Sequence, residues 1–143
     1  MTDQRGQVLA AHSGFYSAFE RAEYDEMVAI WADDDGVVCV HPGAAPIRGH
    51  RAVMRSWLAL MADATYIQFF LTDVEAVVVG DVASVTCTEN VLAAGADTPL
   101  SSFTGGSAAA TNVFRRTAAG WQLWIHHASP VLSRPPLKEG DAP

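Results

Sequence analysis

The spacing of apolar residues changes near Thr65, and this change limits the possible folds more than any other feature of the sequence. Before it, apolar side chains recur at steps of three and four residues, which is the period of an amphipathic helix. After it, residues such as Ile67, Phe69 and Leu71 alternate with polar residues, which is the period of a half-buried strand. The sequence therefore predicts helices followed by strands.

Turn and capping signals divide these two regions into elements. The first region predicts a helix that ends near Ala22, a short helix capped by Asp25, a strand over 37–41 and a helix from about Gly49 to Ala62. The second region predicts four antiparallel strands, with a bulge in the first and the loop 93–106 as a lid. Those strands are expected over 65–79, 82–92, 108–117 and 121–129.

Helices that cluster before a run of strands favour the α+β class, with the helices on one face of the sheet. We expect a cone-shaped roll, in which a curved, mostly antiparallel sheet wraps around three helices and leaves an internal pocket. A chain of 143 residues is long enough for one domain, which we expect over 1–132. Residues 133–143 are expected to form a flexible tail.

Charge and composition exclude several classes of partner. A net charge of −7 opposes binding to nucleic acid or to an anionic membrane. The sequence has no apolar run of membrane-spanning length and no signal core, so we expect a cytoplasmic protein.

Cys39 and Cys87 lie in apolar strands and are expected to be buried free thiols. The five histidines lack the spacing of metal ligands, and no cofactor motif is present, so we expect neither a metal nor a cofactor.

Three polar residues in apolar strands are candidates for a site. His41 is either a general base or a strand-end histidine bonded to a loop carbonyl. Asn112 is either a neutral donor to a developing enolate oxygen or a partner of backbone groups at a bulge. Glu89 is either a buried acid with a raised pKa or one half of an ion pair with Arg115 or Arg116.

Aromatic residues and two neighbouring histidines complete the candidates. Tyr16 lies on the inner face of the first helix, as an oxyanion donor or as ordinary core. His126 and His127 point to opposite faces of a strand, and the alternation puts His127 with the apolar residues Leu123 and Ile125. Three further aromatic residues are expected to line or fill the cavity, namely Trp31, Trp57 and Phe114.

Six segments carry a family resemblance by their order and spacing. They are Phe19–Asp25, Trp31–Asp34, His41–Gly43, Arg48–Val53, Gly120–Leu123 and His126–Pro130. Together they resemble the nuclear-transport-factor-2-like superfamily, and most closely its SnoaL-like, ketosteroid-isomerase-like branch. The resemblance covers about residues 7 to 132. It implies the cone-shaped fold, but not one activity, because this fold serves isomerases, dehydratases and domains without chemistry.

The resemblance also implies roles for individual residues. In the isomerases of this branch, an Asp-Pro pair on the first strand supplies the general base, and His41-Pro42 occupies that place. A tyrosine of the first helix and a protonated aspartic acid of a later strand stabilise the enolate, and Tyr16 and Asn112 fall nearest to those positions. The family pattern also favours His127 as the inward-facing histidine.

Two hypotheses follow from the sequence. In the first, the chain is a cofactor-independent isomerase or dehydratase (lyase) that acts on a small hydrophobic carbonyl compound. His41 abstracts a proton, Asn112 with Tyr16 or His127 stabilises the enolate, and Glu89 assists the loss of water. In the second, it is a non-catalytic domain that binds a small ligand or forms a homodimer through the outer face of the sheet, where Trp124 adds apolar surface.

Overall fold

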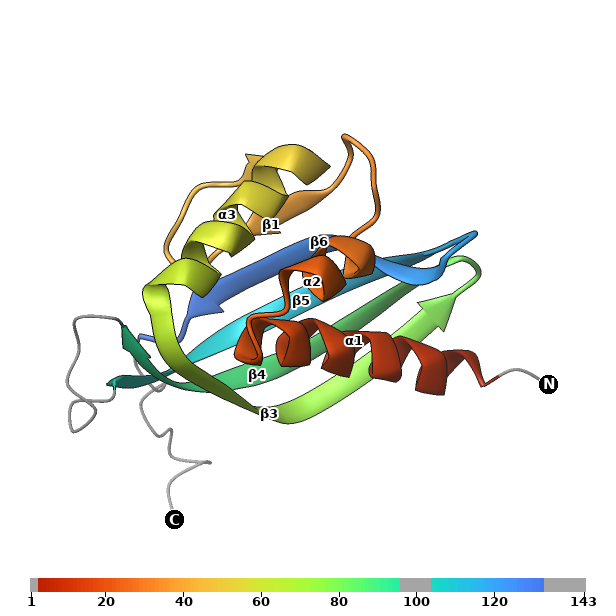
Figure 1. Cartoon of the computed structure of the whole chain (residues 1–143). Coiled ribbons are helices and arrows are strands. Elements are labelled where there is room, and N and C mark those ends of the chain that lie inside the picture. The colour runs from red at the N-terminus through yellow and green to blue at the C-terminus, as the bar shows by residue number, and fades with distance from the viewer. Residues whose placement is uncertain (1–2, 96–103, 133–143) are drawn as a thin grey trace, which may run out of the picture.

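Three helices and six strands make up the part of the chain that the computed structural model describes, residues 3–95 and 104–132 (Figure 1). The helices are α1 (Gln4–Glu20), α2 (Tyr24–Ile30) and α3 (His50–Asp63). The strands are β1 (Val38–Val40), β2 (Ile47–Arg48), β3 (Ala64–Val79), β4 (Val82–Gly95), β5 (Thr104–Thr117) and β6 (Gly120–Pro130). This order confirms the predicted succession of helices and strands and the α+β class.

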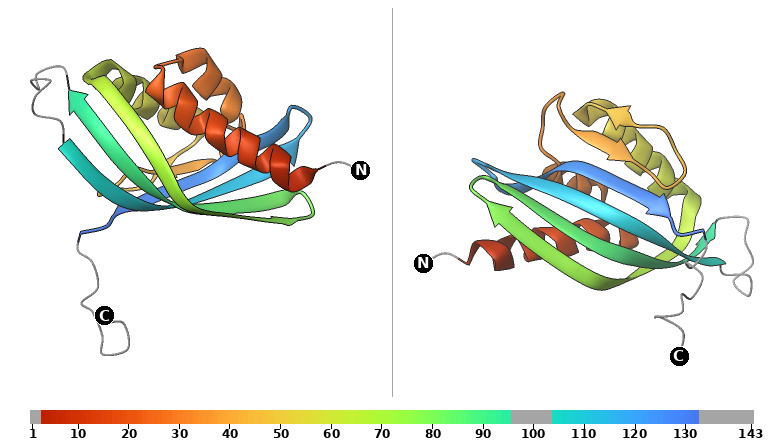
Figure 2. Two further views of the ribbon diagram at one scale, coloured as in Figure 1. Left: turned by 90° about the horizontal axis from the view of Figure 1, so that it is seen from below. Right: turned by 180° about the vertical axis from the view of Figure 1, so that it is seen from behind.

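One mixed sheet contains all six strands, in the order β2-β1-β6-β5-β4-β3. Only β1 and β6 run parallel, and the other neighbours are antiparallel. The long strands are strongly curved, and the helices lie together on the inner face of the curve (Figure 2). A sheet that bends around helices in this way keeps a space between the two layers, which is where the site lies.

Helix α1 is held to the sheet by one side of its surface. Asp3 caps its first turn by accepting a hydrogen bond from the backbone amide of Gly6 at 2.9 Å. Its buried side chains recur at helical spacing and face the strands. They are Val8, His12, Phe15, Tyr16, Ala18 and Phe19. The helix thereby brings two polar side chains, His12 and Tyr16, into the interior.

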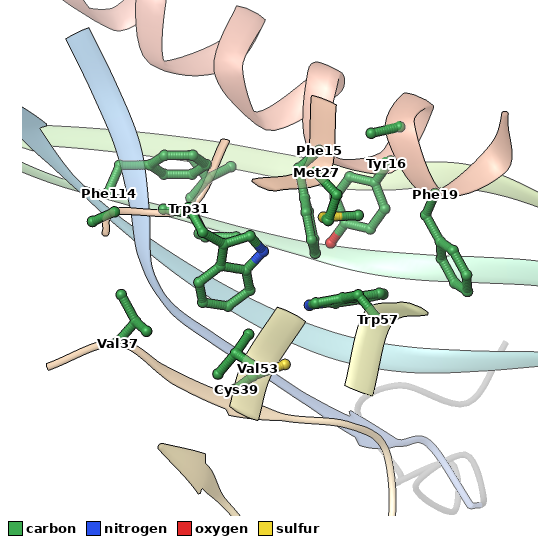
Figure 3. Close-up of a cluster of buried hydrophobic side chains, with 14 of the residues drawn as sticks. Phe15, Tyr16, Phe19, Met27, Trp31, Val37, Cys39, Val53, Trp57 and Phe114 are labelled. Carbon is green, nitrogen blue, oxygen red and sulfur yellow. The ribbon is translucent and has the colours of Figure 1, made fainter. Parts of the chain in front are cut away.

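The core lies where the three helices meet the sheet. Phe15, Met27 and Trp31 are fully or almost fully buried and pack with Trp57 of α3 (Figure 3). The rings of Phe15 and Trp57 meet edge to face, with their centroids 5.3 Å apart. These large side chains fill one part of the space between the layers and leave the remainder open.

A bulge in β6 sets which residues of that strand face inward. Val113 pairs with Ile125, whereas the next residue of β5, Phe114, pairs with Leu123, so that Trp124 is the extra residue. The extra residue reverses the alternation between Leu123 and the end of the strand. As a result, His126 is 3% exposed and His127 is exposed.

A second bulge lies in β3, where the register shifts between Thr72 and Glu75. Asp73 takes a positive φ of 55° within it. This confirms the irregularity predicted in that strand. The bulge bends a strand of 16 residues, which helps it to follow the curve of the sheet.

Several predicted boundaries were wrong. Helix α2 begins at Tyr24 after Glu23, so Asp25 is not its cap but an acidic residue of its first turn, where the helix dipole favours negative charge. The short strand β2 was not predicted, because it has only two residues. The predicted loop 93–106 begins and ends in strand, since Ala93 pairs with Thr104. Its centre (96–103) and the predicted tail lie outside the described residues.

Among residues 3–95 and 104–132, no helix has both the length and the hydropathy needed to cross a membrane.

Candidate functional site

A cavity of about 400 Å³ lies between the helices and the inner face of the sheet. Most of its wall is apolar, and its aromatic residues other than Tyr16 and the histidines are Phe15, Phe19, Trp57 and Phe69. The polar side chains of the wall are Tyr16, His41, Glu89, Ser107 and His126. An apolar cavity with a few converging polar groups is the usual form of a small-molecule site.

Glu89 enters the cavity from β4 and is only 4% exposed. The hydroxyl of Tyr16 donates a hydrogen bond to its Oε2 at 2.6 Å. Burial raises the pKa of Glu89 above its ordinary value of 4.5, and the bond from Tyr16 partly opposes this rise. Burial and the nearby carboxylate also raise the pKa of Tyr16, so the phenol stays protonated and remains a donor. The predicted ion pair with an arginine is absent, because Arg115 pairs with Asp34 and Arg116 with Asp81.

Asn112 joins three buried side chains from behind the cavity wall. Its Nδ2 donates to the Tyr16 hydroxyl at 3.0 Å and to His12 Nε2 at 2.9 Å. Its Oδ1 lies 2.5 Å from Nδ1 of His126. Asn112 has no exposed surface and does not line the cavity. The amide therefore holds Tyr16 and His126 in place, and it has no free donor for a ligand.

The two buried histidines of this network stay neutral. Burial lowers the pKa of His12 to about 4 from 6.5. Burial, with smaller contributions from neighbouring histidines, lowers the pKa of His126 to about 3. Only neutral imidazoles can accept a hydrogen bond, so these rings act as donor–acceptor pairs rather than as charges.

His41 directly follows β1 and lines the cavity. Its Nε2 is 2.9 Å from the hydroxyl oxygen of Ser56, which itself donates to the carbonyl oxygen of Val53 at 2.7 Å. Its ring packs edge to face on Trp57, with centroids 4.8 Å apart. Burial lowers the pKa of His41, which favours the neutral form. The predicted alternative of a bond to a loop carbonyl is not what the structure contains.

Cys39 and Cys87 are buried free thiols, as the sequence predicts. Burial raises the pKa of Cys39 to about 12 and that of Cys87 to about 11, so both stay protonated and unreactive. The Cys87 sulfur packs 3.8 Å from the Tyr16 hydroxyl oxygen. The thiols therefore act as small apolar side chains beside the polar network.

Of the predicted site residues, Tyr16, His41, Glu89 and Trp57 line one cavity, and Asn112 supports it from behind. The prediction that His127 faces the interior was wrong. The bulge at Trp124 turns this residue to the outer face, where it lies beside Thr111 and Ile125 in a shallow depression.

Trp31 and Phe114 were expected either to line the cavity or to fill it, and the structure agrees with the second alternative. Both are fully buried and neither lines the cavity. Phe15 packs on Trp31 with ring centroids 6.2 Å apart and itself forms part of the cavity wall. Trp31 and Phe114 therefore belong to the filled part of the core.

His126, His12 and Ser56 are the members of the site that sequence reasoning missed. In a regular strand, His126 would point to the face opposite the inward residue Leu123. The bulge at Trp124 turns it inward instead. His12 lies on the predicted inner stripe of α1 but has no signal that distinguishes it from core. Within the described ranges, no group of three or more His, Cys, Asp or Glu side chains is arranged to hold a metal ion.

Comparisons with known proteins agree with this architecture. The family model of the SnoaL-like domain matches residues 8–133. A crystal structure from Streptomyces avermitilis, described as a "putative dehydratase from the NTF2-like family", is 45% identical, with a TM-score of 0.84 over 91% of this chain and 98% of that chain. No curated protein sequence matches the chain.

Two further solved structures are similar. A "putative calcium/calmodulin-dependent protein kinase type II association domain" from Thiobacillus denitrificans is 36% identical, with a TM-score of 0.73 over 86% of this chain and 94% of that chain. A ketosteroid isomerase-like protein from Erwinia carotovora atroseptica shares the fold, with 18% identity and a TM-score of 0.76 over 93% of this chain and 100% of that chain. The chain belongs to the SnoaL-like domain family, within the nuclear-transport-factor-2-like superfamily.

Proposed function

We propose that this chain is a cofactor-independent isomerase or dehydratase that acts on a small hydrophobic carbonyl compound. One observation carries the proposal: an imidazole, His41, and a carboxyl group with a raised pKa, Glu89, line the same apolar cavity. Two titratable groups whose environments favour opposite proton states are suited to act as base and acid.

His41 is the base of the proposed reaction. The Ser56 hydroxyl donates its only hydrogen to the carbonyl oxygen of Val53, so the Ser56 oxygen must accept from His41. The imidazole hydrogen of His41 is therefore on Nε2. The lone pair then lies on Nδ1, which is 3.9 Å from the Cys39 sulfur. Burial keeps the ring unprotonated at neutral pH, and an unprotonated imidazole is ready to accept a proton.

Glu89 is the acid. Its Oε2 accepts the hydrogen of Tyr16, so a proton on this carboxyl group would reside on the other oxygen. Burial favours that protonated form by raising the pKa. Tyr16 keeps the carboxyl group in one orientation, and Asn112 in turn keeps Tyr16 in place.

The proton balance of a dehydration is then complete. His41 Nδ1 takes a proton from the carbon next to the carbonyl, and the electron pair moves to the carbonyl oxygen as an enolate. When the carbonyl re-forms, the carbon–oxygen bond to the leaving hydroxyl breaks, and Glu89 gives that group its proton, so that water departs. The imidazolium then returns its proton to the Glu89 carboxylate through solvent. In an isomerisation, His41 instead returns the proton to another carbon of the same enolate.

The comparisons support this reading in a general way. A relative with 45% identity over nearly its whole length is described as a putative dehydratase. The polar groups of the cavity do not require a metal or an organic cofactor for proton transfer. Acid–base chemistry is therefore the simplest use of the residues present.

The proposal is tested by hydrogen exchange in heavy water with 2-tetralone, a bicyclic ketone with acidic hydrogens next to its carbonyl. NMR measures the rate at which these hydrogens are replaced by deuterium. The wild-type protein should accelerate exchange over buffer, and His41→Ala should slow it, since it removes the base that takes the proton. His127→Ala, on the outer face, should match the wild type. Wild-type exchange no faster than buffer would count against the function.

A second candidate function is homodimerisation through the outer face of the sheet. Three valines of the β3–β4 hairpin leave a large share of their surface exposed: Val77 at 58%, Val79 at 73% and Val82 at 42%. An exposed apolar patch on a sheet favours a protein contact. The 36% identical relative described as an association domain supports the same idea. A dimer and a catalytic cavity are compatible, because they use opposite faces of the sheet.

A further inference from the structure

The amide of Asn112 can adopt only one orientation in the observed network. Tyr16 has a single hydroxyl hydrogen, and it goes to Glu89 at 2.6 Å. The Tyr16 oxygen must therefore accept its contact at 3.0 Å from Asn112, which assigns that side of the amide as Nδ2. The second Nδ2 hydrogen goes to His12 Nε2 at 2.9 Å. Both donors of Asn112 are thus used, and its Oδ1 faces His126.

This orientation determines which nitrogen of His126 carries the hydrogen. Oδ1 of Asn112 is an acceptor only, and it lies 2.5 Å from Nδ1 of His126. Nδ1 must therefore be the N–H group. A neutral imidazole has one such group, so Nε2 keeps its lone pair. The ring is neutral because burial lowers its pKa to about 3.

The unprotonated Nε2 belongs to a side chain of the cavity wall. Among the described residues the only side-chain hydrogen bond of His126 is the one between its Nδ1 and Asn112. The ring is held between Phe15, with centroids 4.9 Å apart, and Trp57, at 5.9 Å. Among the described residues this nitrogen has no partner, which leaves it available to a group that enters the cavity.

We propose that Nε2 of His126 is a fixed hydrogen-bond acceptor that selects ligands with a hydroxyl group, and that Asn112 is the positioning residue that sets its tautomer. Among the described residues no lysine or arginine lines the cavity, so the ligand class is uncharged, aromatic or otherwise hydrophobic, and hydroxylated. For catalysis the inference rests on the proposed function, because it makes a hydroxycarbonyl compound the preferred substrate. As a statement about binding it is independent of any reaction.

The selectivity has a physical cause in the cost of an unpaired polar atom. A ligand without a hydroxyl group would remove water from Nε2 and leave it without a partner in an apolar environment. A site built around a hydroxyl group therefore discriminates against an analogue that lacks one. Because Asn112 prevents the ring from exchanging its tautomer, His126 cannot adapt by turning from acceptor to donor.

Calorimetric titration with matched probes tests the selectivity. The probes are 2-naphthol, its methyl ether 2-methoxynaphthalene, and naphthalene, which share one ring system but only the first of which has a hydroxyl hydrogen. The wild type should bind 2-naphthol roughly two- to tenfold more tightly than either analogue. In His126→Phe this ratio should fall to about one, while His127→Phe should keep the wild-type ratio. Equal wild-type affinities, or an unchanged ratio in His126→Phe, would overturn the proposal.

The tautomer is tested separately by nitrogen-15 NMR of the imidazole groups, which distinguishes an N–H nitrogen from a bare one. In the wild type, His126 should have its hydrogen on Nδ1. In Asn112→Leu this preference should weaken, while the signals of the exposed His127 stay unchanged. A wild-type ring with its hydrogen on Nε2 would overturn the proposal even if the Asn112 variant does not fold.

These outcomes separate the inference from the proposed function. Hydroxyl selectivity without deuterium exchange of 2-tetralone would leave His126 as the selector of a binding protein and remove only the catalytic role. Exchange without hydroxyl selectivity would keep the catalytic role and remove this inference.

Discussion

The hydroxyl of Tyr16 on α1 donates a 2.6 Å hydrogen bond to Glu89 on β4, which joins the helical layer to the sheet inside the cavity. Both side chains are at most 5% exposed. The bond compensates part of the cost of burying a carboxyl group, and the Asn112 amide supports it from the other side. The stability of the fold and the geometry of the candidate site therefore depend on the same contact.

Tyr16→Phe should destabilise the protein by about 1–3 kcal/mol, because it leaves a buried carboxylate oxygen and an amide hydrogen without partners. Urea unfolding measures the change in the free energy of unfolding. Tyr24→Phe is the control, since among the described residues the hydroxyl of Tyr24 makes no hydrogen bond, and it should change stability by about 0.5 kcal/mol or less. Equal effects of the two substitutions would contradict a structural role for the Tyr16–Glu89 bond.

Glu89→Gln should increase stability more at pH 8 than at pH 5. The folded pKa of Glu89 lies above the ordinary value of 4.5, so the folded state binds more protons than the unfolded state between pH 4.5 and the folded pKa. The stability that Glu89 contributes to the wild type is therefore lost as the pH rises from 4.5 through the folded pKa of this group. Glutamine does not titrate and avoids the loss. Urea unfolding of both proteins at the two pH values measures the difference, and a difference independent of pH would refute a raised pKa.

His126→Phe should make the protein less sensitive to acid. The folded pKa of about 3 lies below the ordinary value of 6.5 for histidine, so the unfolded state binds the extra proton as the pH falls below 6.5. Wild-type stability should decrease through this window by up to about 1.4 kcal/mol per pH unit from this group alone. The comparison is the slope of unfolding free energy against pH from 6.5 to 4.5. His127→Phe should keep the wild-type slope, and a similar slope in all three proteins would contradict the burial of a neutral His126.

Val77→Glu should convert a dimer into a monomer if the outer face of the sheet is the contact between two copies. A charge in an apolar interface remains without a partner and opposes association. Sedimentation velocity gives the mass in solution. Leu58→Glu, which alters an exposed leucine of α3 (49% exposed) on the helical side, should leave the dimer intact. A wild-type protein that remains monomeric at high concentration would rule out dimerisation.

The fold could be predicted from the sequence because helix and strand periods differ along long segments. The apolar stripe of α1 and the alternation from Ile67 onward can be recognised even when the ends of the elements are misplaced by a few residues. The same patterns predicted that Tyr16, His41 and Glu89 lie inside. Each of them sits in a regular stretch, where the position of one residue determines the direction of the next.

The remaining part of the site depends on local irregularity and on packing that periodicity does not encode. One extra residue, Trp124, exchanges the faces of His126 and His127, and no feature of the sequence marks a bulge there. Trp31 and Phe114 have the spacing of inward residues, but whether an inward ring meets a cavity or another ring is decided by its neighbours. The role of Asn112 likewise follows from three partners on other elements.

The most direct test of acid–base chemistry in the cavity is the deuterium exchange of 2-tetralone by His41→Ala beside His127→Ala. Removal of a general base lowers rates by about 10²- to 10⁴-fold, so His41→Ala should lose most of the protein-catalysed exchange while His127→Ala retains it. Full exchange activity in His41→Ala would show that the proton is taken elsewhere, and the catalytic account of this cavity would be wrong.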